Sequence, residues 1–164
     1  MQLYLIRHGI AQEHTPELKD EERELTKEGR QKTEKVAQRL AKLGLEFDLI
    51  LSSPFARAHQ TAEILINTGL SHKLELSDHL TFTGDIHNWL KDWFQPRNFP
   101  PNTNLALVGH EPCLSSWAEI LLWGEAKERI VLKKAGMIGI KLPDDGTPVG
   151  SSQMFWLTPP KYLL

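Results

Sequence analysis

Short apolar runs alternate with longer amphipathic segments along most of the chain. Each apolar run ends at a polar or turn-forming residue, which predicts a buried strand. Strands are expected at residues 2–6, 48–52, 73–76 and 105–108. Between and after these runs, apolar side chains recur at helical spacing. Helices are therefore expected at residues 26–43, 54–67 and 84–95, and from Pro112 to about Leu122.

Capping residues indicate where several of these helices begin and end. Thr26 is a suitable N-cap for the first helix, and Gly44 suits its end. Ser53 followed by Pro54 predicts the start of the second helix, because proline is favoured at the first helical position. The proline-rich stretch that begins at Pro96 is expected to end the third helix.

The last part of the chain has a different pattern. Residues 137–142 and 153–157 indicate two strands of a hairpin, joined by a turn that contains Asp145-Gly146. Strands that alternate with helices favour an α/β fold with a mostly parallel sheet, covered on both faces and extended by antiparallel strands at one edge. The polar segment 12–24 is expected to form a solvated loop. The length suits one domain spanning residues 1–164.

Composition and charge narrow the possible classes of function. The net charge is −2 and the calculated pI is about 6.4, so no overall basic field attracts nucleic acid or acidic lipid. Cys113 is the only cysteine, which excludes an intrachain disulfide and a cysteine-cluster metal site. No apolar run approaches the roughly 20 residues that span a bilayer. We therefore expect neither a membrane nor a nucleic-acid partner, and a cytoplasmic location.

Three polar clusters each follow a predicted strand: Arg7-His8-Gly9, the segment from Ser53 to Arg57, and Gly109-His110. The carboxyl ends of parallel strands lie along one edge of a sheet, where ligands of open α/β sheets bind. We therefore expect two arginines and two histidines from distant parts of the sequence to meet at one place.

These residue types suit the binding and transfer of a phosphoryl group. Arg7 and Arg57 supply planar sets of donors that match phosphate oxygens. His8 can act as a nucleophile when one ring nitrogen is unprotonated, and Gly9 lets the backbone approach the bound group. A protonated His110 would stabilise negative charge in the transition state. The arginines neutralise the phosphate, so no metal or other cofactor is expected.

The order of the motifs adds a resemblance to a known family. Arg7-His8-Gly9 after an N-terminal strand resembles the signature of the histidine phosphatase superfamily, which includes phosphoglycerate mutases and acid phosphatases. Three further matches follow in the expected order: Leu25-Thr26-x-x-Gly29, Ser53-Pro54-x-x-Arg57-Ala58-x-Gln60-Thr61-Ala62 and Val108-Gly109-His110. The short chain, Thr83-Gly84-Asp85 and Gly109-His110-Glu111-Pro112 resemble the phosphohistidine phosphatase SixA subfamily more narrowly.

The resemblance implies a three-layer α/β/α sandwich of the phosphoglycerate mutase type, with His8 as the nucleophile. It implies that Arg7, Arg57 and His110 form the phosphate pocket, and Gly9 and Ser53 are expected to contact the substrate. The resemblance also implies that the substrate is a phosphohistidine-containing protein, such as a phosphotransfer domain of a bacterial signalling relay.

The chain departs from the mutase members of the superfamily at the proton donor. Those members carry a glutamate donor in a defined pattern, and the corresponding segment here, 80–85, lacks that pattern. A sugar or glycerate oxygen needs a general acid when it leaves, whereas the second ring nitrogen of a phosphohistidine can carry a proton itself. Asp78 and Asp85 are retained as weaker candidates for a donor.

Two alternatives to a phosphohistidine phosphatase remain open. One is a phosphatase of sugar phosphates or other small metabolites on the same scaffold. The other is a phosphohistidine-binding module without catalysis, which the intact His8 disfavours. A run of basic residues is interpreted either as a solvated face or as the rim of a pocket that accepts an acidic protein surface: Lys127, Arg129, Lys133 and Lys134.

Overall fold

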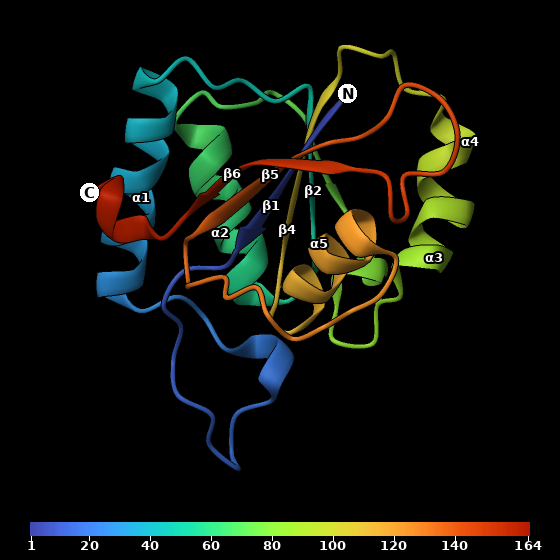
Figure 1. Ribbon diagram of the computed structural model, residues 1–164. Helices are drawn as coiled ribbons and strands as arrows, with labels where there is room; N and C mark the ends of the chain where they lie inside the picture. The colour runs from blue at the N-terminus through green and yellow to red at the C-terminus, as the bar shows by residue number, and fades with distance from the viewer.

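A computed structural model describes residues 1–164 and contains one mixed six-stranded sheet (Figure 1). The strand order is β3-β2-β4-β1-β5-β6. Four strands are parallel: β1 (Gln2–Arg7), β2 (Leu49–Ser52), β3 (Leu74–Leu76) and β4 (Asn104–Gly109). The last two, β5 (Met137–Lys141) and β6 (Gln153–Thr158), are antiparallel and extend the sheet next to β1. The predicted mostly parallel sheet with an antiparallel edge is confirmed.

Helices cover both faces of this sheet, which gives the three layers of an α/β/α sandwich (Figure 1). Successive residues of β1 point to opposite faces. Tyr4 and Ile6 pack against α1 (Lys27–Lys42) and α2 (Ala56–Asn67). Leu3 and Leu5 belong to the other core, with Trp89 and with Trp117 of α5 (Cys113–Trp123). The expected fold class is therefore confirmed.

The third helical segment continues farther than its sequence predicts. It consists of α3 (Ile86–Trp89), one π-helical turn (Leu90–Phe94) and α4 (Gln95–Arg97). Pro96 was expected to end the helix, but it lies inside α4. Proline is tolerated there because the wider π-helical turn directly precedes it. The segment ends instead at Asn98, which has a positive φ of 46°.

Three local predictions about boundaries need correction. Ser53 is not the N-cap of α2 and Pro54 is not its first residue, because the helix begins at Ala56 with Phe55 at the N-cap position. The Ser53 hydroxyl accepts the N–H of Phe55 just before the helix. Leu43 was expected to end the first helix, but α1 ends at Lys42 and Leu43 is 49% exposed. The segment 12–24 is not only a solvated loop, because it contains a 3₁₀ turn at Asp20–Glu22 that contacts α2.

The long loop between α5 and β5 is attached to the core through Glu119. This carboxylate is buried, and it accepts hydrogen bonds from the backbone N–H groups of Lys127, Arg129 and Ile130. Burial acts to raise the pKa of Glu119, but these backbone donors lower it by more, so the pKa lies below its ordinary value. The loop then reaches β1, where Ala135 donates its N–H to backbone oxygens at the end of the strand.

Glu119→Gln is expected to lower the free energy of unfolding by about 2–4 kcal/mol, because an amide accepts these hydrogen bonds less strongly and directs its own N–H groups at backbone donors. Urea unfolding measures the effect. Glu125→Gln is the control, since Glu125 is an exposed partner of Lys127 and should change stability by less than about 0.5 kcal/mol. Equal effects of the two substitutions would contradict the role given to Glu119.

No helix in the structure combines the length and the apolar character needed to cross a membrane.

Candidate active site

The carboxyl ends of β1, β2 and β4 meet, and the predicted polar clusters meet with them. Arg7 lies opposite Gly109 across the β1–β4 pair, and the backbone N–H of His8 donates to the carbonyl of Gly109. Ser53, which follows β2, donates its N–H to the carbonyl of Val108. The parallel register therefore places the residues that end each strand side by side, as the sequence predicts.

The His8 side chain is buried and held in one orientation. Its Nδ1 lies 2.7 Å from the carbonyl oxygen of Gly9, which can only accept, so Nδ1 carries the proton of the neutral ring. Its Nε2 is therefore unprotonated, and its lone pair accepts a hydrogen bond of 3.3 Å from Nε of Arg57. This is the tautomer that a histidine nucleophile requires.

The surroundings of His8 keep the ring neutral. Burial is the largest cause, and it lowers the pKa of His8 to about 3, although the hydrogen bond to Gly9 acts in the opposite direction. The positive charges of Arg57 and Arg7 act in the same direction as burial and contribute to this value. His8 is thus unprotonated at neutral pH.

Gly9 lies where a side chain does not fit. A Cβ atom at this position would be 2.3 Å from Oγ1 of Thr33, a contact that real Cβ atoms do not make. The N–H of Gly9 donates to Oγ1 of Thr61 at 3.0 Å, and that hydroxyl donates to the carbonyl of Arg57 at 2.8 Å. These contacts join the turn after β1 to the first turn of α2.

Arg57 is 1% exposed and makes contacts along the whole guanidinium group. Its Nη1 donates to the backbone oxygen of Asp20 at 2.7 Å, and its Nη2 donates to the Asp20 carboxylate at 3.0 Å. Arg23 donates to the other carboxylate oxygen of Asp20 at 2.8 Å. Burial acts to raise the pKa of Asp20, but its hydrogen bonds to Arg23 and Arg57 lower it by more, so the carboxylate is ionised.

Asp20 is the residue of this site that the sequence analysis missed. It lies in the polar segment that was expected to be solvated, and only the folded chain brings it to Arg57. The spacing of Asp20 and Arg23 within a polar segment is a weak signal, since such pairs are common on exposed surfaces.

His110 is fully buried beside His8, with a distance of 5.2 Å between the ring centroids. Its Nε2 lies 2.8 Å from Oγ of Ser53. That hydroxyl already accepts the N–H of Phe55 and has no other acceptor for its proton. We therefore assign the hydroxyl proton to His110 Nε2, which leaves the ring proton on Nδ1. Burial, assisted by the charge of Arg57, lowers the pKa of His110 to about 3.

Two buried nitrogen atoms at the site have no partner within the protein. They are Nε of Arg7 and Nδ1 of His110. Arg7 is otherwise held by a hydrogen bond of 3.0 Å from Nη1 to the carbonyl of Leu132. Buried donors without partners are uncommon in folded proteins, and here they suit the oxygens of a bound anion.

The two candidate proton donors lie outside this cluster. Asp85 caps α3, where its carboxylate accepts the N–H of Asn88 at 3.0 Å. Asp78 is exposed in a 3₁₀ turn, where its backbone oxygen accepts a hydrogen bond from Thr81. No hydrogen bond or ion pair connects either carboxylate to the histidines or arginines of the site. The structure contains no group of three or more acidic, histidine or cysteine side chains arranged to hold a metal ion.

The two buried histidines make stability depend on pH in a predictable direction. Their pKa values fall from 6.5 to about 3 on folding, so the unfolded chain binds more protons between these limits. The stabilisation is complete above about pH 6.5 and is lost as the pH falls towards 3. Between about pH 7 and pH 5, each histidine is expected to account for a loss of about 1–2 kcal/mol in unfolding free energy. Urea unfolding in phosphate-free buffer measures this. If the unfolding free energy of His110→Gln depended on pH as steeply as that of the wild type, the prediction would be wrong.

Fold and site together define an α/β phosphatase. The chain belongs to the histidine phosphatase superfamily (branch 1), whose family model matches residues 3–81. An uncharacterized protein from Picosynechococcus sp. strain PCC 7002 is 40% identical over 165 residues, which cover 100% of this chain and 99% of that protein.

Solved structures of similar fold include enzymes with different substrates. The protein histidine phosphatase SixA, complexed with tungstate, has a TM-score of 0.83 and 24% identity and covers 100% of both chains. A putative α-ribazole-5′-P phosphatase from Escherichia coli strain K-12 has a TM-score of 0.73 and 21% identity and covers 98% of both chains. At these identities, the likenesses establish the shared fold.

Proposed function

We propose that this protein is a phosphohistidine phosphatase that removes the phosphoryl group from a histidine of another protein through a phospho-His8 intermediate. The observation that carries the proposal is the neutral His8 ring, with Nδ1–H directed to Gly9 and an unprotonated Nε2 that accepts a hydrogen bond from the Arg57 guanidinium. These residues can bind the phosphoryl group of several classes of substrate. The classes differ in the group that leaves phosphorus, so the leaving group decides between them.

In the first step, Nε2 of His8 attacks phosphorus in line with the leaving nitrogen. The new N–P bond forms as the bond between phosphorus and the substrate imidazole breaks, and the imidazole leaves as a neutral ring when its other nitrogen carries a proton. Arg7, Arg57 and Nδ1–H of His110 hold the phosphoryl oxygens and stabilise their charge. Ser53 orients His110 and Gly9 orients His8.

In the second step, water attacks phospho-His8. The phosphorylated ring carries a positive charge because Nδ1 keeps its proton, and the Gly9 carbonyl stabilises that charge. The ring then leaves with its electron pair on Nε2, and the proton lost by water passes to phosphate or solvent. His8 returns to its starting tautomer.

The charge of Asp20 supports phosphohistidine as the substrate. The Asp20 carboxylate is hydrogen-bonded within the site, and two arginines keep it ionised. An ionised carboxylate has no proton to give to a leaving alkoxide, so Asp20 does not suit the role of a general acid. A protonated imidazole needs no such donor. The likeness in fold to SixA over the full length of both chains agrees with this choice.

The alternative is a phosphatase of small metabolites, and the likeness in fold to the putative α-ribazole-5′-P phosphatase is the observation that favours it. Initial hydrolysis rates for a phosphohistidine-containing phosphotransfer domain and for a panel of small phosphate esters distinguish the two. We expect efficient turnover of the protein substrate and slow turnover of every ester. Efficient turnover of one ester, together with an unchanged phosphohistidine, would replace the proposal with the alternative.

A further inference from the structure

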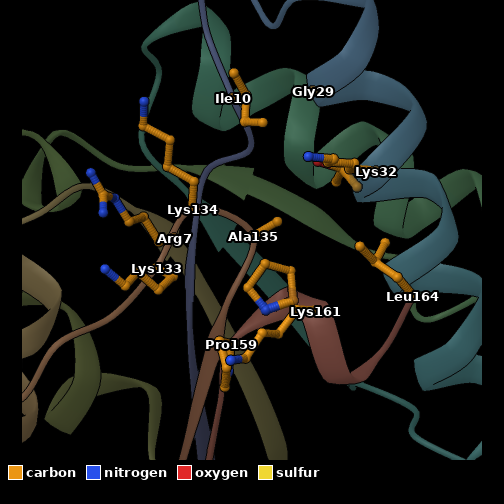
Figure 2. Close-up of a pocket in the computed structure, with 12 residues that line it drawn as sticks. Arg7, Ile10, Gly29, Lys32, Lys133, Lys134, Ala135, Pro159, Lys161 and Leu164 are labelled. Atoms are coloured by element: carbon orange, nitrogen blue, oxygen red, sulfur yellow. The ribbon is translucent and has the colours of Figure 1, made fainter.

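A basic pocket lies next to the candidate active site. It has a volume of about 710 Å³ and lies between α1, the segment before β5 and the C-terminal turn (Figure 2). Its walls include small and apolar residues, such as Gly29, Ala135 and Pro159. Four lysines from these three regions line it: Lys32, Lys133, Lys134 and Lys161.

The pocket and the active site share a wall. Arg7 and Ile10 line the pocket, and the two residues between them are the candidate nucleophile His8 and Gly9. Nε of Arg7 is buried without a partner, as described above. Oγ1 of Thr33, another residue of the pocket wall, is also buried and has no hydrogen-bond partner. Arg7 therefore links the pocket to the candidate active site.

The positive charge of the pocket is largely uncompensated. Lys133 and Lys134 are exposed and take part in no ion pair. Lys32 is paired with the exposed Glu28 at 2.7 Å, and Lys161 lies over the ring of Tyr162. The whole chain has a net charge of −2, so this cluster is a local concentration of positive charge in an otherwise slightly acidic protein.

We infer that this pocket binds acidic side chains that flank the phosphohistidine in the protein substrate. The inference rests on the proposed function and adds a second contact between enzyme and substrate. The phosphoryl group occupies the site at His8, and carboxylates close to it in the substrate lie among the lysines beside Arg7. Complementary charge of this kind accelerates encounter and selects partners, and it weakens as salt increases.

Two synthetic peptides provide the test. Both carry one phosphohistidine, flanked by glutamates in one peptide and by glutamines in the other. The enzyme variants are wild type, the double variant Lys133→Glu/Lys134→Glu, and the control Lys73→Glu/Lys141→Glu. The control makes the same change in charge at exposed residues near the opposite ends of the parallel strands. The readout is the ratio of the KM values for the two peptides at low and high salt.

Wild type and control are expected to show a KM about tenfold lower for the glutamate peptide, and the Lys133/Lys134 double variant is expected to lose this preference. High salt should reduce the preference in wild type. No preference in wild type, or a preference that persists in the double variant, would overturn the inference while leaving the proposed function intact. Failure of wild type to hydrolyse either peptide would instead reject the proposed function.

Sedimentation of the same variants tests a second copy of the chain as the occupant. A dimer of the wild-type protein that dissociates in the Lys133/Lys134 double variant would identify the pocket as an interface between copies and would overturn the inference. A sedimentation coefficient that is the same in all variants is the expected result.

Discussion

His8→Ala is expected to lower kcat/KM for phosphohistidine hydrolysis by at least about four orders of magnitude, because no other group in the site is placed to form the covalent intermediate. The physical reason is the lone pair on Nε2 of His8, which faces the arginine that binds phosphate. Nδ1 of His8 is engaged with Gly9, and Nε2 of His110 is engaged with Ser53. The loss should appear in kcat, since the arginines that bind phosphate remain.

Trapping the intermediate gives a second readout for the same variant. Rapid quenching without acid, followed by mass spectrometry, should detect phospho-His8 in the wild type and no phosphorylated enzyme in His8→Ala. His72→Ala is the matched control, because His72 is exposed in the turn before β3 and should retain normal turnover. A His8→Ala variant with more than a tenth of wild-type activity, or a label on His110, would contradict the mechanism.

Arg57→Ala is expected to reduce kcat/KM by about 10²–10³-fold, because the variant loses a charged, planar donor set next to the attacking nitrogen. Arg57→Lys keeps the charge without that geometry and should recover only part of the loss. Steady-state kinetics measure both effects, and thermal unfolding shows whether each variant is folded. Equal activity of Arg57→Lys and wild type would mean that charge alone is required.

Asp20→Asn distinguishes two roles of the Asp20 carboxylate, which are to orient Arg57 and to place a negative charge next to the phosphate site. Asparagine can still accept the hydrogen bond from Nη2 through its carbonyl oxygen, while the negative charge next to the phosphate site is removed. Inorganic phosphate should then inhibit about fivefold more strongly, because a like charge no longer opposes its binding. Weaker inhibition would indicate instead that the carboxylate is needed to orient Arg57.

Much of the fold could be predicted from local patterns. The buried strands, the Thr26 cap and the alternation of strands with helices all follow from short-range periodicity and capping chemistry. The errors occur where a long-range contact changes a local preference. Ser53 looks like a helix cap, but its hydroxyl also pairs with His110, which is distant in sequence. Pro96 looks like a helix end, but a π-helical turn lets the helix continue through it.

Some residues of the candidate site could likewise be predicted from local patterns, and others could not. His8, Arg57 and His110 could be placed together because the register of parallel strands brings strand ends to one edge of the sheet. Asp20 could not, because its segment has neither apolar periodicity nor a capping pattern, and its position depends on a buried arginine more than thirty residues later in the chain. The exposure of Asp85 and Asp78 likewise depends on turns whose packing local sequence does not specify.

The amino-acid sequence by itself determined the elements, the mostly parallel sheet and the residue types that meet at its edge, because these depend on periodicity, capping and the geometry of parallel strands. Only the tertiary structure decided the tautomer of His8, the ion pair between Arg57 and Asp20 and the pocket formed by three separate regions around Arg7. Each of these depends on distances between groups far apart in the chain, and such distances are set by the packing of the complete molecule.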